Sequence, residues 1–445
     1  MAHFATMMRV AFEALRLRRH ERWSRADILA HQKREFEKLR RYAYRKSPFY
    51  RQFHAGLFDA PLSELPVLTK KMVMENFDSV VTNRRLKLNS VHELLARPQY
   101  GRIKNCEVVT TSGTTGMPGV FVFNAAEWAR IAAAFARARE WSGGGVLLGK
   151  TKRLAIVAST DEHFVTARIS RLAKIPFMPV LHLDVIAPIP ELVEKLNAWQ
   201  PQILSVYAGT GYQLALRQAA GELNIHPRQI LTGSEVLTKK MRAAMQRVWG
   251  DVVFDAYGST EAAVIGAETR DHNGLQVFED MVIVENVDAL NRPVVDGECG
   301  EKLLVTPLFH RTLPLIRYEL SDRVIFAPSA TDRVNGYRRI VAISGRQEDA
   351  LQFGQHSVHP NVFHSVMDQV PCSGWQIVQT TRGLTVLIAG GVQSDSLADR
   401  VREALRRQQI TEEYLPEVII QPVQEIPKSR SGKTPLIKAL STSAS

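Results

Sequence analysis

Short apolar runs alternate with amphipathic stretches across the middle of the chain. The apolar runs are candidates for buried strands, at residues 153–158, 203–207, 229–232 and 252–254. Helical spacing of apolar positions between them predicts helices at residues 124–141, 190–199, 212–220 and 237–249. Such alternation of strands and helices predicts an α/β domain built on a parallel sheet.

The two ends of the chain have other patterns. Residues 5–22 and 25–45 are basic and amphipathic, which predicts two helices, and Pro48 ends the second. Residues 280–345 are strand-rich with Gly and Asp turns, which favours a smaller β subdomain. The tail combines two strand patterns with one helical pattern, at residues 385–389, 417–420 and 396–407. We therefore expect a large N-terminal α/β domain with parallel sheets and a β subdomain, followed by a small α+β domain.

A run of hydroxyl side chains and glycines lies between two apolar strand patterns. It comprises Thr111, Ser112, Gly113, Thr114, Thr115 and Gly116. Glycine lets a backbone approach a ligand closely, consecutive N–H groups form a concavity for anions, and hydroxyls add rotatable donors. The pattern favours a loop that grips phosphate, although a hairpin turn has a similar composition. It is not a Walker A loop, because no Gly-Lys-Ser/Thr follows at the required spacing.

Three further polar stretches lie downstream, at residues 255–261, 317–323 and 427–433. The four motifs, in this order, resemble the adenylate-forming superfamily of acyl-CoA synthetases, peptide-synthetase adenylation domains and luciferases. Within it, the chain is most similar to the short phenylacetate–coenzyme A ligase branch, from the helix before Pro48 to Lys433. The resemblance implies two half-reactions. A carboxylate attacks the α-phosphorus of ATP to give an acyl-adenylate and pyrophosphate, and a thiol then displaces AMP.

The resemblance also assigns the nucleotide contacts. The hydroxyl-rich loop would hold the β- and γ-phosphates, although Met117 replaces a lysine that is usual in the family. Tyr257 would stack on adenine, Thr260 would bond the α-phosphate, and Glu261 would supply the hard oxygen that Mg²⁺ prefers. Glu235 would lie against the adenine and the acyl group, or could equally be a helix N-terminal acid. The expected nucleotide set also includes Gly233, Ser234, Asp255, Ala256, Gly258 and Ser259.

Asp322 follows the apolar run 313–318, which we expect to be a strand. A carboxylate at the start of the next loop can accept both ribose hydroxyls of ATP, and the family has an aspartate at the matching place. A strand-end aspartate that only makes a turn is the alternative. Arg346 is the expected second contact to ribose or phosphate.

Lys433 is the expected catalytic lysine, because a compact ammonium on a long stem can reach both the attacking carboxylate and the bridging oxygen. Residues 344–349 resemble the family's interdomain hinge, with Glu348 as the pivot. The expected division is therefore a domain at residues 1–345, a hinge at 346–349 and a small mobile domain at 350–445. Rotation would let Lys433 and a thiol visit the same carbonyl in turn.

The acyl pocket is expected where a strand opens onto a helix, the usual place for ligands in parallel sheets. Tyr207, Ala208 and Gly209 occupy such a junction, and the two small residues leave room for a flat ring. Phe164 and His163 are further candidates, although a surface-loop histidine is a common alternative for His163. The branch resemblance implies an aromatic acid, of the benzoate or hydroxybenzoate type.

Composition bounds the partners. The net charge is +12, and residues 1–53 hold 14 Lys/Arg against 5 Asp/Glu. Such a block fits an acidic partner or an anionic membrane surface, or is only a solvated basic helix. No nucleic-acid-binding motif accompanies the charge, so we expect no nucleic-acid partner. Three widely spaced cysteines and no signal-like N-terminus favour the cytoplasm.

The sequence thus predicts an acid–thiol ligase that uses ATP and Mg²⁺. The expected acceptor is the phosphopantetheine of an acyl carrier protein, because carrier proteins are generally acidic and this chain is basic. Coenzyme A, itself anionic and used by the similar branch, is the alternative. A rival of another class is a non-catalytic nucleotide-binding protein of the same fold.

Overall fold

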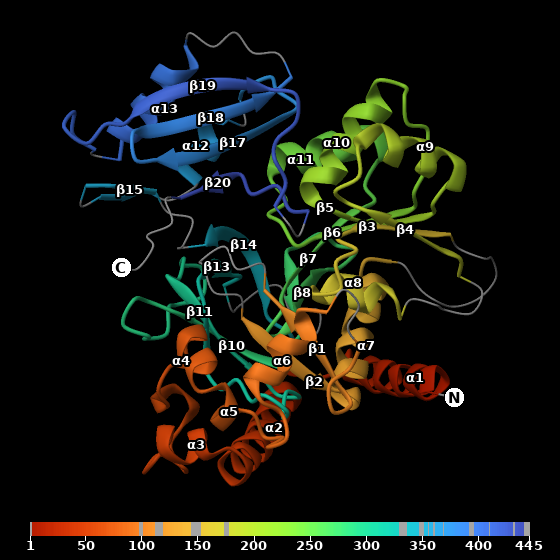
Figure 1. Cartoon of the computed structure of the whole chain (residues 1–445), viewed down its shortest axis with the longest axis vertical. Helices are drawn as coiled ribbons and strands as arrows, with labels where there is room; N and C mark the ends of the chain where they lie inside the picture. Colours follow the sequence, from red (N-terminus) through yellow and green to blue (C-terminus); the bar gives the residue numbers. More distant parts are fainter. Residues whose placement is uncertain are drawn as a thin grey trace.

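The structure is a computed structural model of the whole chain (Figure 1). It describes residues 2–97, 101–111, 119–143, 153–172, 178–328, 336–346, 351–354, 356–358, 361–367, 369–390, 396–408, 410–429 and 432–439, with the backbone alone at residues 2–5, 346, 357, 361, 364 and 365. Most of the hydroxyl-rich loop, at residues 112–116, lies outside this range, as does the predicted pivot Glu348.

The N-terminal part is helical, as predicted. A capping box between Ser24 and Asp27 starts the second helix, and Pro48 follows its end. The first helix packs along α7 (Ala125–Trp141), while the next four gather at the end of the molecule farthest from the C-terminal sheet (Figure 1). These elements are α1 (Ala2–His20), α2 (Arg25–Lys46), α3 (Pro48–Phe53), η1 (Leu62–Glu64), α4 (Lys70–Glu75), α5 (Phe77–Val80) and α6 (Leu88–Leu95).

A large mixed sheet organises the middle of the chain. Five parallel strands run β4-β3-β5-β6-β7, and the antiparallel strands β8, β9, β14 and β13 continue the sheet, counted over the described residues. The parallel part confirms the predicted α/β sheet. The strands are β3 (Leu154–Ala158), β4 (Val180–Asp184), β5 (Ile203–Tyr207), β6 (Gln229–Gly233), β7 (Val253–Ser259), β8 (Ala263–Glu268), β9 (Leu275–Val277), β13 (Asp322–Phe326) and β14 (Arg339–Arg346).

The two faces of the parallel strands have different neighbours. Buried positions such as Ala155, Leu204 and Ile230 pack with residues of the helices that follow the strands, and form one core. Alternate positions point to the other face, where α7 and α8 lie. The helices are α8 (Val165–Ser170), α9 (Ile189–Trp199), α10 (Ala208–Ala219) and α11 (Lys239–Trp249). Asn124 caps α7, because its side chain accepts from the amides of Ala126 and Glu127.

The strand-rich stretch at 280–345 divides between two sheets. β10 (Val282–Val287), β11 (Lys302–Pro307) and β12 (Tyr318–Leu320) form a small antiparallel sheet, whereas β13 and β14 join the large one. The expected strand at 313–318 is wrong, since only its last residue is in β12 and the rest is a buried irregular segment. Asp322 consequently begins strand β13 instead of a loop. A further hairpin, β1 (Cys106–Thr110) with β2 (Val120–Asn124), brackets the hydroxyl-rich loop.

The tail forms a separate α+β unit with its own apolar core, which includes Trp375, Ile377 and Val401. Its sheet order is β19-β18-β17-β20, and a short hairpin β15-β16 precedes it, in the part of the tail that the structure describes. The elements are β15 (Leu351–Phe353), β16 (His356–Val358), α12 (Asn361–Met367), β17 (Gly374–Thr380), β18 (Gly383–Ala389), α13 (Leu397–Arg406), β19 (Glu417–Val423) and β20 (Ile437–Lys438). The exact hinge stays a prediction.

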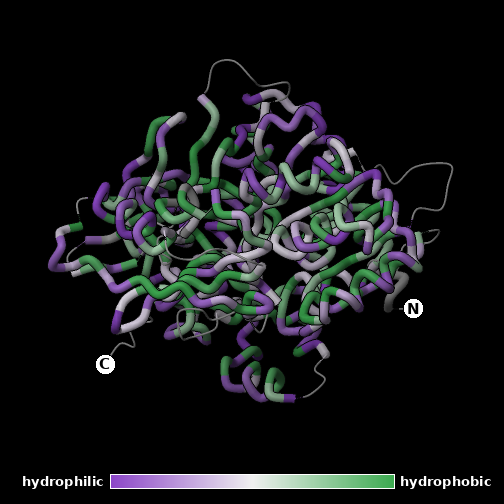
Figure 2. Tube along the Cα trace, turned by 90° about the horizontal axis from the view of Figure 1, so that it is seen from above, coloured by the Kyte–Doolittle hydropathy of each residue, from purple (hydrophilic) through white to green (hydrophobic). Residues whose placement is uncertain are grey.

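Hydrophobic and hydrophilic stretches alternate along the chain instead of forming one continuous apolar block (Figure 2). Among the described helices, none combines the length and the apolar character that crossing a bilayer requires.

Candidate functional site

The carboxyl ends of the parallel strands open into one cavity of about 1130 Å³. This volume exceeds the ~300–1,000 Å³ of a typical small-molecule site, as expected where two ligands bind together. The cavity collects most of the predicted residues. Its described lining includes Thr111, Phe164, Tyr207, Gly233, Ser234, Glu235, Asp255, Ala256, Tyr257, Gly258, Ser259, Thr260, Glu261, Asp322 and Lys433.

The hairpin β7–β8 presents the central motif. Gly258 lies at a register shift, and a Cβ there would collide with the backbone of Ala263, so only glycine fits. Glu261 lies in the turn between the two strands, is buried, and has a carboxylate oxygen that accepts from the Tyr318 hydroxyl at 3.3 Å. Tyr318 belongs to the polar stretch at residues 317–323, but the sequence alone suggested no role for it. Its position beside Glu261 follows only from the pairing of β12.

Asp322 and Arg346 stand opposite each other in the β13–β14 ladder. Their pairing brings the backbones of the two predicted ribose contacts together. The motifs alone did not indicate that these residues are neighbours. Asp322 is buried at the cavity wall. At the entrance to the hydroxyl-rich loop, Thr111 is pinned to Gly119, since its Oγ1 accepts from the Gly119 amide at 2.8 Å.

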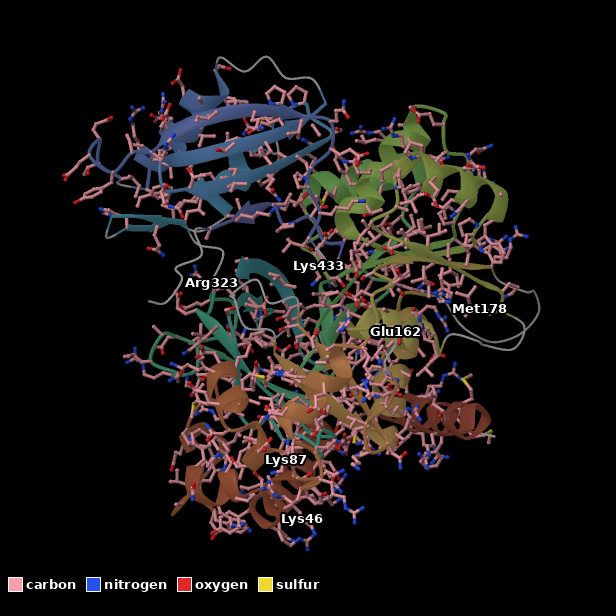
Figure 3. All side chains as sticks on the ribbon, in the orientation of Figure 1. Lys46, Lys87, Glu162, Met178, Arg323 and Lys433 are labelled. Carbon is pink, nitrogen blue, oxygen red and sulfur yellow. The ribbon has the colours of Figure 1, made fainter. Side chains whose placement is uncertain are left out.

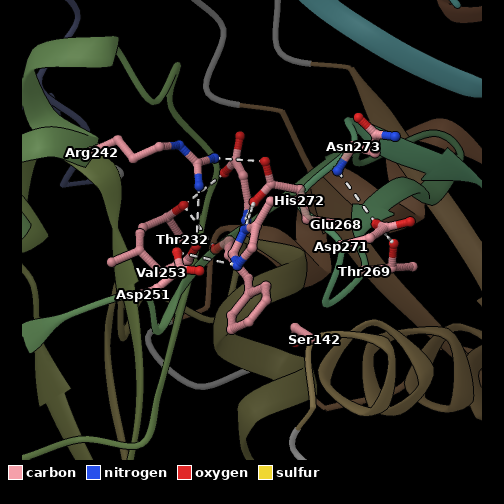
Figure 4. Close-up of polar contacts among 12 residues, drawn as sticks. Ser142, Thr232, Arg242, Asp251, Val253, Glu268, Thr269, Asp271, His272 and Asn273 are labelled. Atoms are coloured by element: carbon pink, nitrogen blue, oxygen red, sulfur yellow. Dashed lines mark hydrogen bonds and ion pairs between the residues drawn. The ribbon is translucent and has the colours of Figure 1, made fainter. Parts of the chain in front are cut away.

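Asp255 belongs to a charged network on the sheet. Its carboxylate accepts from the Thr232 hydroxyl at 2.7 Å, and its amide donates to Glu268 at 2.9 Å. Arg242 donates to the other oxygen of Glu268 at 2.6 Å (Figure 4). Desolvation raises the pKa of Asp255 to about 6, opposed by the Thr232 hydroxyl. This carboxyl can therefore exist in either protonation state near neutral pH.

One wall of the cavity is a row of two apolar side chains and a serine that the sequence analysis did not identify as a cavity wall. Ile156, Ser205 and Leu231 lie side by side in register on three adjacent strands and are only half-buried. Phe135 of α7 and Ile169 of α8 line the same cavity. The alternate strand positions had the pattern of a sheet buried on both faces, and nothing local distinguishes a cavity wall from a core.

The predicted acyl residues separate into two groups. Tyr207 and Phe164 line the cavity, and the Tyr207 hydroxyl lies 3.3 Å from Thr166 Oγ1. Ala208 and Gly209 form the first turn of α10, which begins earlier than expected because its glycines are tolerated there. His163 contacts the Asp161 carboxylate and the Leu95 carbonyl, and its role as a substrate contact stays a prediction.

Lys433 comes from the C-terminal unit and reaches the cavity at its junction with the large sheet (Figure 3). Its carbonyl accepts from the Ser429 amide at 2.7 Å, which closes a tight loop. The next residue, Thr434, donates its amide to Glu235 at 2.5 Å. Side chains of α10 and α11 hold the same unit, since Tyr212 and Lys240 donate to the carbonyls of Cys372 and Val370 at 3.2 and 2.7 Å.

The fold resembles that of solved acyl-CoA ligases. The 2-hydroxyisobutyryl-CoA ligase, solved in the post-adenylation state with an acyl-AMP, covers 94% of this chain and 89% of its own at a TM-score of 0.67 and 18% identity. In its thioesterification state the same ligase gives a TM-score of 0.54, over 93% of this chain.

Curated relatives match most of the chain. The phenylacetate-coenzyme A ligase of Pseudomonas putida is 26% identical over 354 residues, 75% of each chain. Protein CapK of Staphylococcus aureus is 24% identical over 355 residues, 76% of this chain and 72% of its own. No protein-family model matches the chain. The predicted resemblance to the adenylate-forming superfamily and its phenylacetate–coenzyme A ligase-like branch is thus confirmed.

Proposed function

We propose that this protein is a ligase that activates a carboxylic acid with ATP and transfers the acyl group to a thiol. A carboxylate oxygen attacks the α-phosphorus and pyrophosphate leaves. The thiol sulfur then attacks the carbonyl carbon, the bond to the AMP oxygen breaks, and a thioester forms. One observation carries the proposal: Lys433 of the C-terminal unit lines the same cavity as Thr260, Glu261 and Asp322 of the large domain.

The chain's own residues supply position and charge in this scheme, as phosphoryl-type chemistry demands. Lys433 neutralises charge between the acid and the α-phosphate, Thr260 bonds a phosphate oxygen, and Asp322 holds the ribose. Mg²⁺ is commonly bound by one or two carboxylates together with substrate phosphates. Glu261 fits that pattern, because it is a cavity-lining carboxylate held by Tyr318. The ion would offset the negative charge of the phosphates.

The acid that we propose is aromatic. A flat apolar ring suits the wall formed by Ile156, Leu231 and Phe135, and Tyr207 bounds the strand end of the same cavity. A benzoate or hydroxybenzoate would place its carboxylate toward the nucleotide end. Support also comes from the relative named phenylacetate-coenzyme A ligase.

Coenzyme A is the acceptor that the named relatives favour. A carrier-protein phosphopantetheine is the second candidate, and the basic N-terminal segment favours it. Part of that positive charge is already paired within the protein, however, because Arg18 forms an ion pair with Glu140 at 2.9 Å and Arg25 with Glu279 at 2.6 Å. The remaining cations could still steer an acidic carrier or contact an anionic membrane surface weakly.

Pyrophosphate release over a panel of carboxylic acids tests the proposal, with coenzyme A or host carrier proteins supplied in parallel. We expect release that depends on an aromatic acid, and a thioester with one of the two acceptors. Carrier acylation that falls steeply with salt would favour electrostatic steering. Nucleotide binding without pyrophosphate release from any acid would support the non-catalytic alternative.

A further inference from the structure

Glu235 bridges the two domains at the edge of the cavity. Its Oε2 accepts from the Gly209 amide at 2.8 Å, in the first turn of α10, and its Oε1 accepts from the Thr434 amide at 2.5 Å. One oxygen is therefore fixed to the large domain, where the helix N-terminus favours a negative charge. The other oxygen holds the backbone of the C-terminal unit one residue after Lys433.

Two further contacts between the described part of this loop and the large domain gather at one point. The Lys428 ammonium donates to the Val185 carbonyl at 2.6 Å. Gly432 is buried against the Val185 side chain, at a positive φ of 74°. The position of Lys433 thus depends on two anchors, a packed contact at Val185 and the carboxylate of Glu235.

The electrostatics of Glu235 depend on whether the loop is docked. Desolvation raises the pKa of this carboxyl, while the amides of Thr434 and Gly209 and the charges of Lys433 and Lys428 oppose the rise. Departure of the loop would remove the Thr434 amide and both ammonium groups. In the docked state these groups stabilise the Glu235 carboxylate as an anion.

We propose that Glu235 is a positioning residue that holds the Lys433 loop in the cavity for adenylate formation and releases it for thioester formation. This inference rests on the proposed two-step function, and differs from a nucleotide contact in which Glu235 touches adenine. It predicts that Glu235 matters for one half-reaction only. Its contribution is to the orientation of Lys433, and therefore to kcat more than to the KM for ATP.

The test compares Glu235→Ala, Glu235→Gln and a control, Glu222→Gln, whose exposed carboxylate pairs only locally with Arg217 on the α10 side of the large domain. Single-turnover pyrophosphate release measures the first half-reaction. Thioester formation from a supplied acyl-adenylate measures the second. Hydrogen exchange at the Thr434 amide reports on the anchor in the absence of any reaction.

For Glu235→Ala we expect adenylation kcat to fall by roughly 10–100-fold, the scale of losing a hydrogen bond to a charged group. The KM for ATP and the second half-reaction should change by less than about 3-fold, and Thr434 exchange should accelerate at least about 10-fold. Glu235→Gln should be intermediate because its amide oxygen still accepts one bond, and Glu222→Gln should match the wild type.

Three results would overturn the inference: equal losses in both half-reactions, a raised KM with unchanged kcat, or unchanged Thr434 exchange. A wild-type protein that releases no pyrophosphate with any acid would defeat the proposed function instead. In that case the exchange measurement still decides whether Glu235 anchors the loop.

Discussion

The two halves of the candidate site are held in very different ways. Glu261, Asp322 and Tyr257 lie on strands and a hairpin of one continuous sheet, where backbone ladders and a buried core fix them. Lys433 lies on a loop of a separate unit and is held to the large domain by contacts at Val185 and Glu235. The half of the candidate site that lies on the sheet is fixed by the fold, whereas the position of Lys433 depends on contacts between two units.

This difference suits a two-step reaction. In the proposed scheme the nucleotide portion stays bound through both steps, so its contacts belong on rigid elements. A charge needed in only one step gains from a weaker attachment, because elements that move are drawn from the less stable parts of a protein. The predictions below test the contrast between the fixed and the conditional half.

Removal of the conditional charge should give the largest effect. We expect Lys433→Ala to lose adenylate formation by ~10²–10³, the scale of one preorganised charge at a transition state. Thioester formation from a supplied acyl-adenylate should survive. Separate single-turnover measurements of the two halves check this, and equal losses would show that Lys433 has a structural role.

Gly432→Ala should displace the whole loop without touching its charge. A Cβ at this position would collide with Val185 Cγ1, and the positive φ adds strain. We expect adenylation to fall by roughly 10–100-fold, corresponding to the ~1–3 kcal/mol cost of overpacking. Val185→Ala in the same chain should restore part of the rate. If the double variant is no faster than Gly432→Ala, the contact with Val185 is not what limits docking.

Asp255→Asn probes the fixed half through stability. The folded pKa of Asp255, about 6, lies above its usual value of 3.8, so the folded state loses stability as pH rises through about 6. A shift of this size corresponds to at most about 3 kcal/mol. Denaturant unfolding between pH 4 and 8 measures the free energy of unfolding of both proteins. Relative to the wild type, Asp255→Asn should be more stable above pH 6 than it is at pH 4. Parallel curves for the two proteins would rule out this titration.

Loss of one peripheral docking bond should have the smallest effect. Lys240→Met removes the bond to the Val370 carbonyl, far from the reacting atoms. A bond of this kind contributes about 1 kcal/mol, so adenylation should slow by about 5-fold or less. The second half-reaction should be unchanged or faster. Slowing of thioester formation alone would mean that this contact belongs to another domain arrangement.

The sequence could indicate that the residues of the fixed half lie together, because its motifs are local. Tyr257, Thr260 and Glu261 belong to one hairpin, and the carboxyl ends of parallel strands converge wherever such strands are adjacent. The capping of α7 by Asn124 is also a local feature of the sequence, since it depends on residues three apart.

The remainder depended on contacts between distant segments. Tyr318 reaches Glu261 through strand pairing, and Glu235 meets Thr434 across the domain boundary. In the sequence, the pattern around Ile156, Ser205 and Leu231 is that of a buried core. Only the structure shows that these residues line a cavity. Likewise β13 and β14 join the large sheet because of long-range register, which the turn pattern at 280–345 did not reveal.

The central claim, that a carboxylate of the substrate attacks the α-phosphorus of ATP, can be tested by isotope transfer. An acid labelled with ¹⁸O at both carboxylate oxygens is incubated with ATP, the protein and the accepting thiol. The masses of AMP and pyrophosphate are then measured by mass spectrometry. The account predicts that AMP carries one ¹⁸O atom and pyrophosphate carries none, because the bridging oxygen stays with AMP when the thiol attacks. Unlabelled AMP, or ¹⁸O in inorganic phosphate accompanied by ADP, would contradict it.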